Sequence, residues 1–248
     1  MLATRWPNAV ADALRRGIAS RVPSLCAVCR GWGRGRICAS CLDRFAAPVP
    51  RCGRCALPMV MPASTCGTCL TAPPPFDGAL AAVDYRAPWD RLVTAFKFHG
   101  ALDLAAALAE AIVGAERRRA AATRPSLLLP VPLAEARWRE RGYNQAWELA
   151  RRVSRRLGLV ADPDLLLRTR ETAHQLALPF ADRAGNVRGA FALEPRRRGE
   201  LRGRHVAIVD DVMTTGSTAA EIAAVVRQAG AATVEIWVVA RTPRPGDA

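Results

Sequence analysis

One segment of the sequence combines two carboxylates with a run of hydroxyl side chains. The apolar stretch at residues 205–209, HVAIV, leads into Asp210 and Asp211 and then into the loop Thr214–Thr218, TTGST. A loop that opens a helix offers a phosphate backbone N–H groups and the positive end of the helix dipole. Gly216 lets the backbone approach the phosphate closely. Carboxylates accept hydrogen bonds from vicinal diols, so the segment predicts a site for a ribose 5-phosphate.

The same residues have a simpler interpretation, in which the acids cap a helix and the hydroxyl residues form an ordinary turn. Strand, acid pair, hydroxyl-rich loop and helix follow one another without a gap, which favours the binding site. The loop is not a Walker A loop, because it has no Gly-Lys-Ser/Thr sequence and no lysine nearby.

The second chemical signal is a set of eight cysteines, all of them between positions 26 and 69. They form four C-x-x-C pairs: Cys26/Cys29, Cys38/Cys41, Cys52/Cys55 and Cys66/Cys69. Two such pairs complete a tetrahedral zinc site with a closed shell, so two structural Zn²⁺ ions are predicted. The simplest pairing gives one ion to the first four cysteines and one to the last four. A pairing of the first pair with the third, disulfides and an iron–sulfur site are the alternatives.

Reduced thiolates favour a cytoplasmic location. The residues before the first cysteine lack the long apolar stretch of a secretory signal. They fit an amphipathic helix with Val10, Leu14 and Ile18 on one face, or an arginine-rich organellar transit peptide. No stretch approaches the ~20 apolar residues that a bilayer span needs, so no membrane span is expected.

The charge of the chain makes polyanions plausible partners. Lys and Arg total 36 against 22 Asp and Glu, a net charge of +14. Nucleic acids, phosphorylated small molecules and anionic surfaces all fit this charge, which does not choose among them. Arginines surround the cysteines, where they would contact nucleic acid or simply form solvated surface: Arg30, Arg34, Arg36, Arg44, Arg51 and Arg54.

The elements that must position these residues alternate between strand and helix patterns. Strands are expected at 78–85, 126–131, 205–209 and 233–240, and helices at 89–98, 101–122, 144–157 and 217–228. This alternation predicts an α/β fold with a mostly parallel sheet, whose ligands bind beyond the carboxyl ends of the strands. Three parts are expected: an N-terminal helix (1–24), a double zinc ribbon (25–75) and an α/β domain (76–248). The proline run 73–75 marks the boundary between the last two.

Several motifs together resemble a known family. VAIVDDVMTTGST (206–218) looks like the phosphoribosyl-pyrophosphate (PRPP) loop of type I phosphoribosyltransferases. LLLPVPLAEARWRERGYNQAWELARRV (127–153) resembles the pyrophosphate-binding segment of the ComF family, also called ComFC or GntX-like. A spaced pattern of that family is matched by Arg168, Arg170, Thr172, Gln175, Leu178, Arg183, Asn186 and Phe191. The resemblance covers about 26–241, but some members carry only four cysteines, so the second metal site depends on spacing alone.

The resemblance implies a type I phosphoribosyltransferase-like fold, with a mostly parallel sheet and flanking helices after a small four-cysteine zinc-ribbon module. It implies PRPP as ligand, with Asp210 and Asp211 at the ribose hydroxyls, directly or through Mg²⁺. The 5-phosphate would be held by Thr214, Thr215, Gly216, Ser217 and Thr218. Pyrophosphate would be held by Arg137, Arg139 and Arg141, with Lys97 as a further ligand or a plain surface lysine. Arg168 and Arg170 are catalytic candidates in a segment, 168–186, that is either a closing loop or a surface hairpin.

Three functions are compatible with these residues. The first is a phosphoribosyltransferase, in which a nitrogen nucleophile displaces pyrophosphate from the anomeric carbon. The second is a competence factor that binds single-stranded DNA and works with DNA-uptake proteins, because family members are associated with natural transformation. For that function Trp32 and Trp138 are candidates for base stacking, whereas Trp147 is expected to pack. The third is a regulator that senses PRPP without turnover.

Overall fold

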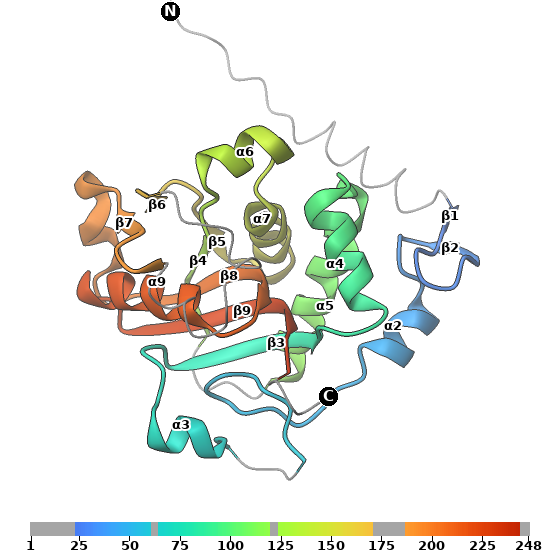
Figure 1. The fold of residues 1–248 in the computed structure, drawn as a ribbon, viewed down its shortest axis with the longest axis horizontal. Coiled ribbons are helices and arrows are strands. Elements are labelled where there is room, and N and C mark those ends of the chain that lie inside the picture. The colour runs from blue at the N-terminus through green and yellow to red at the C-terminus, as the bar shows by residue number, and fades with distance from the viewer. Residues whose placement is uncertain (1–22, 61–63, 120–123, 171–186, 244–248) are drawn as a thin grey trace, which may run out of the picture.

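The computed structural model describes residues 23–60, 64–119, 124–170 and 187–243. The helix predicted within 1–24 lies outside these residues, except that Pro23–Leu25 form a short strand, β1. Figure 1 shows a central sheet with helices packed around it. In the described part of the chain, no helix has the length and apolar character to cross a membrane.

The central sheet has five strands, and all of its neighbouring strands are parallel. Its order is β3 (Gly78–Asp84), β9 (Thr233–Arg241), β8 (His205–Met213), β4 (Leu127–Pro130) and β5 (Val160–Ala161). The predicted α/β class is therefore confirmed. β8 runs beyond the predicted end at Val209, because Asp210–Met213 continue to pair with Val238–Arg241 of β9. The acid pair thus lies on paired backbone instead of in a loop.

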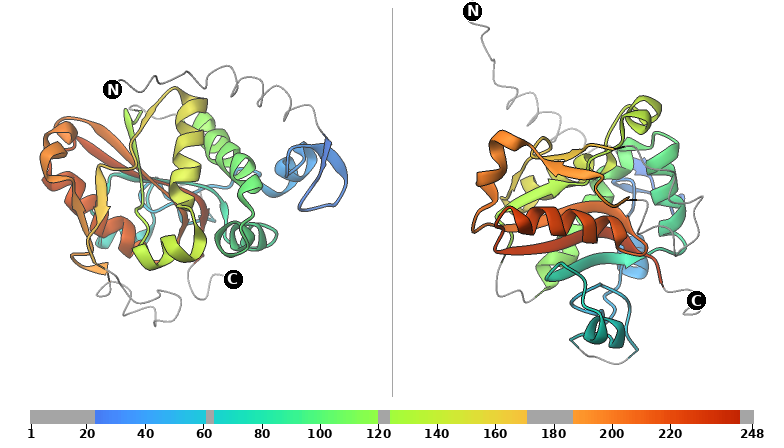
Figure 2. Two further views of the ribbon diagram at one scale, coloured as in Figure 1. Left: turned by 90° about the horizontal axis from the view of Figure 1, so that it is seen from above. Right: turned by 60° about the vertical axis from the view of Figure 1, so that its left-hand side comes forward.

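Helices cover both faces of the sheet, as Figure 2 shows. One face packs against α4 (Trp89–Phe98), α5 (Ala105–Arg118) and α7 (Gln145–Leu157), and the other against α9 (Ser217–Gln228). The helices α4 and α9 have the predicted bounds. The helix predicted over 101–122 instead begins with a 3₁₀ turn, η1 (Leu102–Leu104), because the chain enters it from Gly100 at φ +63° and a non-helical Ala101.

The remaining described elements are short. Helix α6 (Glu135–Arg141) precedes α7, and β6 (Leu166–Arg168) pairs antiparallel with β7 (Phe191–Leu193), which leads into η4 (Pro195–Leu201). Most of the predicted 168–186 loop, including Thr172, His174, Gln175, Leu178, Arg183 and Asn186, lies outside the described residues.

The cysteine region packs on the α/β domain at two separate places (Figure 1). The first half, with β1, β2 (Trp32–Arg34) and α2 (Ala39–Phe45), docks beside α4, where Trp89 Nε1 donates to the Phe45 carbonyl at 2.7 Å. The second half, with α3 (Gly67–Thr71), lies along β3, where Ala79 N–H donates to the Gly53 carbonyl at 3.0 Å. Each cysteine group is therefore attached to a different part of the domain.

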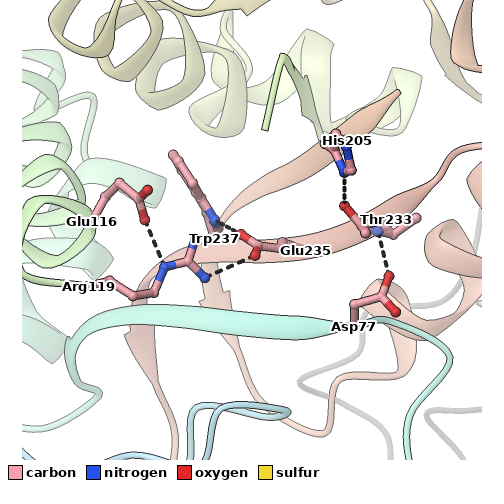
Figure 3. A network of polar contacts seen from close by, with 8 residues as sticks. Asp77, Glu116, Arg119, His205, Thr233, Glu235 and Trp237 are labelled. Atoms are coloured by element: carbon pink, nitrogen blue, oxygen red, sulfur yellow. Dashed lines mark hydrogen bonds and ion pairs between the residues drawn. The ribbon is translucent and has the colours of Figure 1, made fainter. Parts of the chain in front are cut away.

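A polar network closes the amino-terminal side of the sheet (Figure 3). Arg119 donates two hydrogen bonds to Glu235, at 3.1 and 2.7 Å, and one to Glu116 at 3.0 Å. Trp237 Nε1 donates to Glu235 at 2.9 Å, and the ring nitrogen of His205 bonds the Thr233 hydroxyl at 2.9 Å. Because the charges of this network are paired and hydrogen-bonded, we interpret it as structural. A ligand is then expected at the opposite, carboxyl end of the sheet.

Candidate functional site

The two acids at the end of β8 lie in different environments. Asp211 is 4% exposed, and its carboxylate forms an ion pair with Lys97 of α4 at 2.9 Å. Asp210 is half-buried and lines a cleft at the carboxyl end of the sheet, where one of its oxygens accepts the Asp211 N–H at 2.8 Å. Both acids line the cleft, and the charge of Asp211 is in addition paired with Lys97.

The charges of Lys97 and the acids are coupled. Burial favours the neutral form of Lys97, but the Asp211 and Asp210 carboxylates outweigh it and raise its pKa. Burial, and secondarily the Asp211 charge, raises the pKa of Asp210 to about 7. The ionised form of such a carboxylate is stabilised by a nearby cation or by hydrogen bonds from sugar hydroxyls. The donor set fits Mg²⁺, which prefers oxygen ligands and keeps water and substrate oxygens around it, and Asp210 would be the residue that holds it.

The Thr214–Thr218 loop joins β8 to α9 as predicted. Gly216 has φ +84°, a left-handed conformation that favours glycine, and it stands at the N-cap of α9 without a capping side chain. Thr215 Oγ1 accepts the Ser217 N–H at 3.2 Å and bonds the Ser217 hydroxyl at 2.8 Å. All five loop residues line a cavity together with Asp210. The loop is thus a pre-shaped concave turn at a helix N-terminus, which suits an anion.

The opposite wall of the cleft carries arginines from α6. The cleft is lined by Arg137 and Arg141, and the Arg141 guanidinium lies 4.6 Å from the centre of the Phe98 ring. Burial and the Arg137 charge lower the pKa of Arg141, because a neighbouring like charge destabilises the charged form. Arg139 instead pairs with Glu135 on the exposed side of α6.

Two further residues at this wall did not enter the sequence predictions. Gln145, the first residue of α7, is 3% exposed, and its Nε2 has no hydrogen-bond partner among the described residues. Asn144 caps α7 by accepting the Ala146 N–H at 2.9 Å, and it donates to the Val131 carbonyl at 3.1 Å. Both line the cleft. Their signal was the polar Asn-Gln pair following Gly142, which ends α6 at φ +74°.

The remaining sequence candidates are Arg168, the last residue of β6, and Arg170, which follows the strand. Arg168 lines the cleft, with its guanidinium 5.4 Å from the centre of the Phe191 ring. Arg170 is exposed and donates to the Arg188 carbonyl at 2.6 Å. Arg168, Arg137 and Arg141 therefore share the cleft with the acids, whereas Arg139 and Arg170 make contacts outside it.

The eight cysteines gather into two clusters of four. Cys26, Cys29, Cys38 and Cys41 form the first cluster, Cys52, Cys55, Cys66 and Cys69 form the second, and within each cluster the sulfurs lie within 4.8 Å of one another. The sequential pairing is therefore the one the structure brings together. The sulfurs of Cys29 and Cys38, and those of Cys55 and Cys66, are 3.7 Å apart. A tetrahedron with Zn–S bonds of about 2.3 Å has edges of about 3.8 Å, so both clusters fit zinc, and this distance is too long for a disulfide.

Backbone N–H groups support thiolates in both clusters. Val28 and Cys38 donate to Cys26 Sγ at 3.4 Å, and Cys66 donates to Cys52 Sγ at 3.2 Å. Burial opposes ionisation of Cys26, but its backbone hydrogen bonds outweigh burial and lower its pKa to about 6. Burial raises the pKa of Cys41 to about 12 and also raises that of Cys69. Each site thus couples metal binding to proton release.

Comparison with known proteins gives a family match to the carboxyl-terminal part of the chain. The family model described as "Phosphoribosyl transferase domain" matches residues 141–247. The solved hypoxanthine phosphoribosyl transferase of Trypanosoma cruzi is 14% identical, with a TM-score of 0.35 over 60% of this chain and 76% of that one. A likeness this low carries no argument about function.

Two relatives match almost end to end. "DNA utilization protein YhgH" of Salmonella typhimurium is 38% identical over 230 residues, 89% of this chain and 98% of the relative. "Competence protein F" of Haemophilus influenzae is 33% identical over 222 residues, 87% of this chain and 96% of the relative. The chain joins a phosphoribosyl transferase domain to two cysteine clusters. Because its identity to these relatives extends over almost their whole length, the chain belongs to the ComF family, with DNA utilization protein YhgH and Competence protein F.

Proposed function

We propose that the cleft binds phosphoribosyl pyrophosphate with Mg²⁺. The observation that carries the proposal is a cleft lined by the acid pair and by Arg137 and Arg141, which shares Asp210, Thr214 and Thr218 with the cavity of the hydroxyl-rich helix N-terminus. Asp210 and Asp211 would hold the ribose hydroxyls and the Thr214–Thr218 loop the 5-phosphate. Arg137 and Arg141, with the unpartnered Nε2 of Gln145, would hold the pyrophosphate.

The reaction that suits such a site is substitution at the anomeric carbon. A bond forms between that carbon and a nitrogen nucleophile, the bond to the pyrophosphate oxygen breaks, and the nitrogen loses a proton. Arg137, Arg141 and Arg168 would stabilise the negative charge that develops on the leaving pyrophosphate. Mg²⁺, when bound, would add charge neutralisation at the same oxygens.

The cysteine clusters complete the proposal. Each would hold one structural Zn²⁺, with all four ligand positions filled by thiolates. The division of the chain into an N-terminal segment (1–24), a zinc-binding part (25–75) and a transferase domain (76–248) is part of this proposal. So is a reducing, cytoplasmic setting, because the ligands must remain thiolates.

The test is calorimetric titration of PRPP with Mg²⁺ into the zinc-loaded protein and into the double variant Asp210→Asn/Asp211→Asn. We expect the double variant to lose at least 100-fold in affinity. Glu135→Gln, on the exposed side of α6, is the matched control and should bind as the wild type does. A folded, zinc-loaded wild type that does not bind PRPP would contradict the proposal. Release of pyrophosphate in a screen of nitrogen acceptors separates a transferase from a sensor.

A second candidate function, binding of single-stranded DNA, is favoured by exposed aromatic rings on a basic chain. Trp32 is 75% exposed at the start of β2, and Trp138 is 50% exposed on α6, whereas Trp147 packs against the core as predicted. The names of the relatives refer to DNA utilization and competence. We expect a salt-dependent affinity for an oligonucleotide that falls about tenfold in Trp32→Ala, since stacking contributes ~1–3 kcal/mol per base. Equal binding by wild type and variant would count against Trp32 as a stacking residue.

A further inference from the structure

Arg241, the last residue of β9, contacts both the second cysteine cluster and the start of the phosphate loop. Its side chain is buried, at 6% exposure. Nη1 donates to the carbonyl of Met213 at 3.0 Å and to the carbonyl of Thr214, while Nε donates to the carbonyl of Cys55 at 2.9 Å. One guanidinium therefore joins two regions that are more than 150 residues apart in the sequence.

On the loop side, these hydrogen bonds help to fix the direction of two peptide groups; the Met213 carbonyl also accepts the Thr242 N–H at 3.1 Å. In a planar trans peptide the carbonyl and the following N–H point in opposite directions. Because the Met213 and Thr214 carbonyls point at Arg241, the N–H groups of Thr214 and Thr215 point away from it. Both residues line the cavity proposed for the 5-phosphate, where backbone N–H groups are the donors that an anion uses.

On the cluster side, the Cys55 carbonyl belongs to a metal-binding turn. The Ala56 N–H donates to the Cys52 carbonyl at 2.8 Å, and Ala56 has φ +56°, a left-handed conformation that a residue with a side chain rarely adopts. A metal bound by Cys52 and Cys55 would hold this turn closed. A planar guanidinium is a rigid fork, so movement of the Cys55 carbonyl would be passed on to Met213 and Thr214.

The first cluster makes a natural comparison, because it docks elsewhere. Its contacts run from Phe45 to Trp89 and from Arg36 to Asp103, the latter ion pair at 2.7 Å. Among the described residues, none of its hydrogen bonds or ion pairs reaches residues 213–218.

We infer that Arg241 is a positioning residue that makes phosphate binding at Thr214–Thr218 depend on metal in the second cluster and not in the first. The inference rests on the proposed function for the identity of the ligand, and on zinc as the ion at the cysteines. Loss of that metal would release the Cys55 turn, and with it the orientation of the loop N–H groups.

Hydrogen exchange of the loop amides in the unliganded, full-length protein tests this without requiring PRPP to bind. Cys69→Ala and Cys41→Ala are a matched pair, since each removes the last ligand of its cluster and each cysteine is buried in a short helix. We expect exchange at residues 214–218 to become at least tenfold faster in Cys69→Ala and to stay at the wild-type rate in Cys41→Ala. Equal acceleration in both variants, or none in either, would overturn the inference.

Substitutions of Arg241 keep all eight cysteines and decide the question if Cys69→Ala does not fold. We expect Arg241→Met to retain both zinc ions but to bind ribose 5-phosphate at least tenfold more weakly, and Arg241→Lys to recover part of the loss. Wild-type affinity and wild-type loop exchange in Arg241→Met would overturn the coupling. A wild type that binds neither ribose 5-phosphate nor PRPP contradicts the proposed function alone, because the exchange experiment still reports on the coupling.

Discussion

The two ends of the parallel sheet both bury charged groups, but they treat them differently. At the amino-terminal end, Arg119 is bonded to both Glu116 and Glu235 (Figure 3). At the carboxyl end, Lys97 pairs with Asp211, while Asp210 is left with a pKa raised to about 7 by burial and by its neighbour. Nearby, Gln145 Nε2 and Arg141 Nε are buried without partners among the described residues.

This difference distinguishes a stabilising network from a binding site in this fold. Paired charges hold neighbouring elements together, whereas acids and unpartnered donors that line a cleft keep an energetic cost that a ligand can remove. Burial raises the pKa of Glu116 as well, but its carboxylate is paired with Arg119, whereas Asp210 lines the cleft. The contrast can be tested by asking where a substitution changes stability and where it changes binding.

The largest effect is expected at the amino-terminal network. Arg119→Met leaves the buried Glu116 and the half-buried Glu235 without their cation, and we expect a loss of about 3 kcal/mol in the free energy of unfolding. Denaturant unfolding measures this, with Arg118→Met, exposed on the same helix, as the control. PRPP affinity should be unchanged in molecules that remain folded. A weakened affinity would show that the two ends of the sheet are not separable.

A smaller loss in the free energy of unfolding is expected at the carboxyl end of the sheet, because protonation of Asp210 reduces the negative charge left without Lys97. Lys97→Met should cost about 2 kcal/mol at pH 8. The cost should be smaller at pH 5.5, because Asp210, whose pKa is about 7, is then protonated in both proteins and the lost attraction between Lys97 and the Asp210 carboxylate no longer counts. Unfolding curves at the two pH values provide the measurement. A loss that does not depend on pH would contradict the coupling between Lys97 and the acid pair.

Asp210 gives the wild-type protein a pH dependence of its own. Its folded pKa of about 7 lies above its ordinary value of 3.8, so the folded state keeps a proton that the unfolded state releases between these values. The free energy of unfolding contributed by this group therefore falls as pH rises from about 4 to 7. Asp210→Asn should remove that slope and gain at least about 1 kcal/mol at pH 8, because a pKa difference of one corresponds to ~1.4 kcal/mol, while losing PRPP binding. A variant less stable than the wild type at pH 8 would refute this.

The smallest effect is expected at Gln145. Gln145→Leu replaces an unpartnered buried amide by an apolar group of similar size, so we expect a change in stability within about 1 kcal/mol. If Nε2 serves the pyrophosphate, affinity for PRPP should fall several-fold while affinity for ribose 5-phosphate stays the same. Parallel losses for both ligands would place Gln145 elsewhere in the site.

The local pattern predicted most of the sheet and helices. Helices α4 and α9 have the predicted bounds, because apolar periodicity and loop chemistry define both of their ends. The end of β8 was predicted four residues early, since two adjacent acids read as the end of a strand. Only pairing with β9, which depends on tertiary contact, extends the strand to Met213.

The candidate site was predictable where its residues are contiguous. The acid pair and the Thr214–Thr218 loop lie beside the cleft as the sequence indicated. The positions of Arg137 and Arg139 differ although they share one short helix, because one faces the cleft and the other faces Glu135. Arg241 could not be found from sequence, because its partners are backbone carbonyls that only the fold brings together.

The strand order has a consequence for folding during synthesis. Within the described residues β9 is the last strand, yet it lies between β3 and β8 in the sheet. Until residue 241 has left the ribosome, β3 has no neighbour in the central sheet and β8 has one exposed edge. Such edges are prone to pair with other chains. The nascent chain therefore depends on its final strand to join the part that carries the second cysteine cluster to the part that carries the phosphate loop.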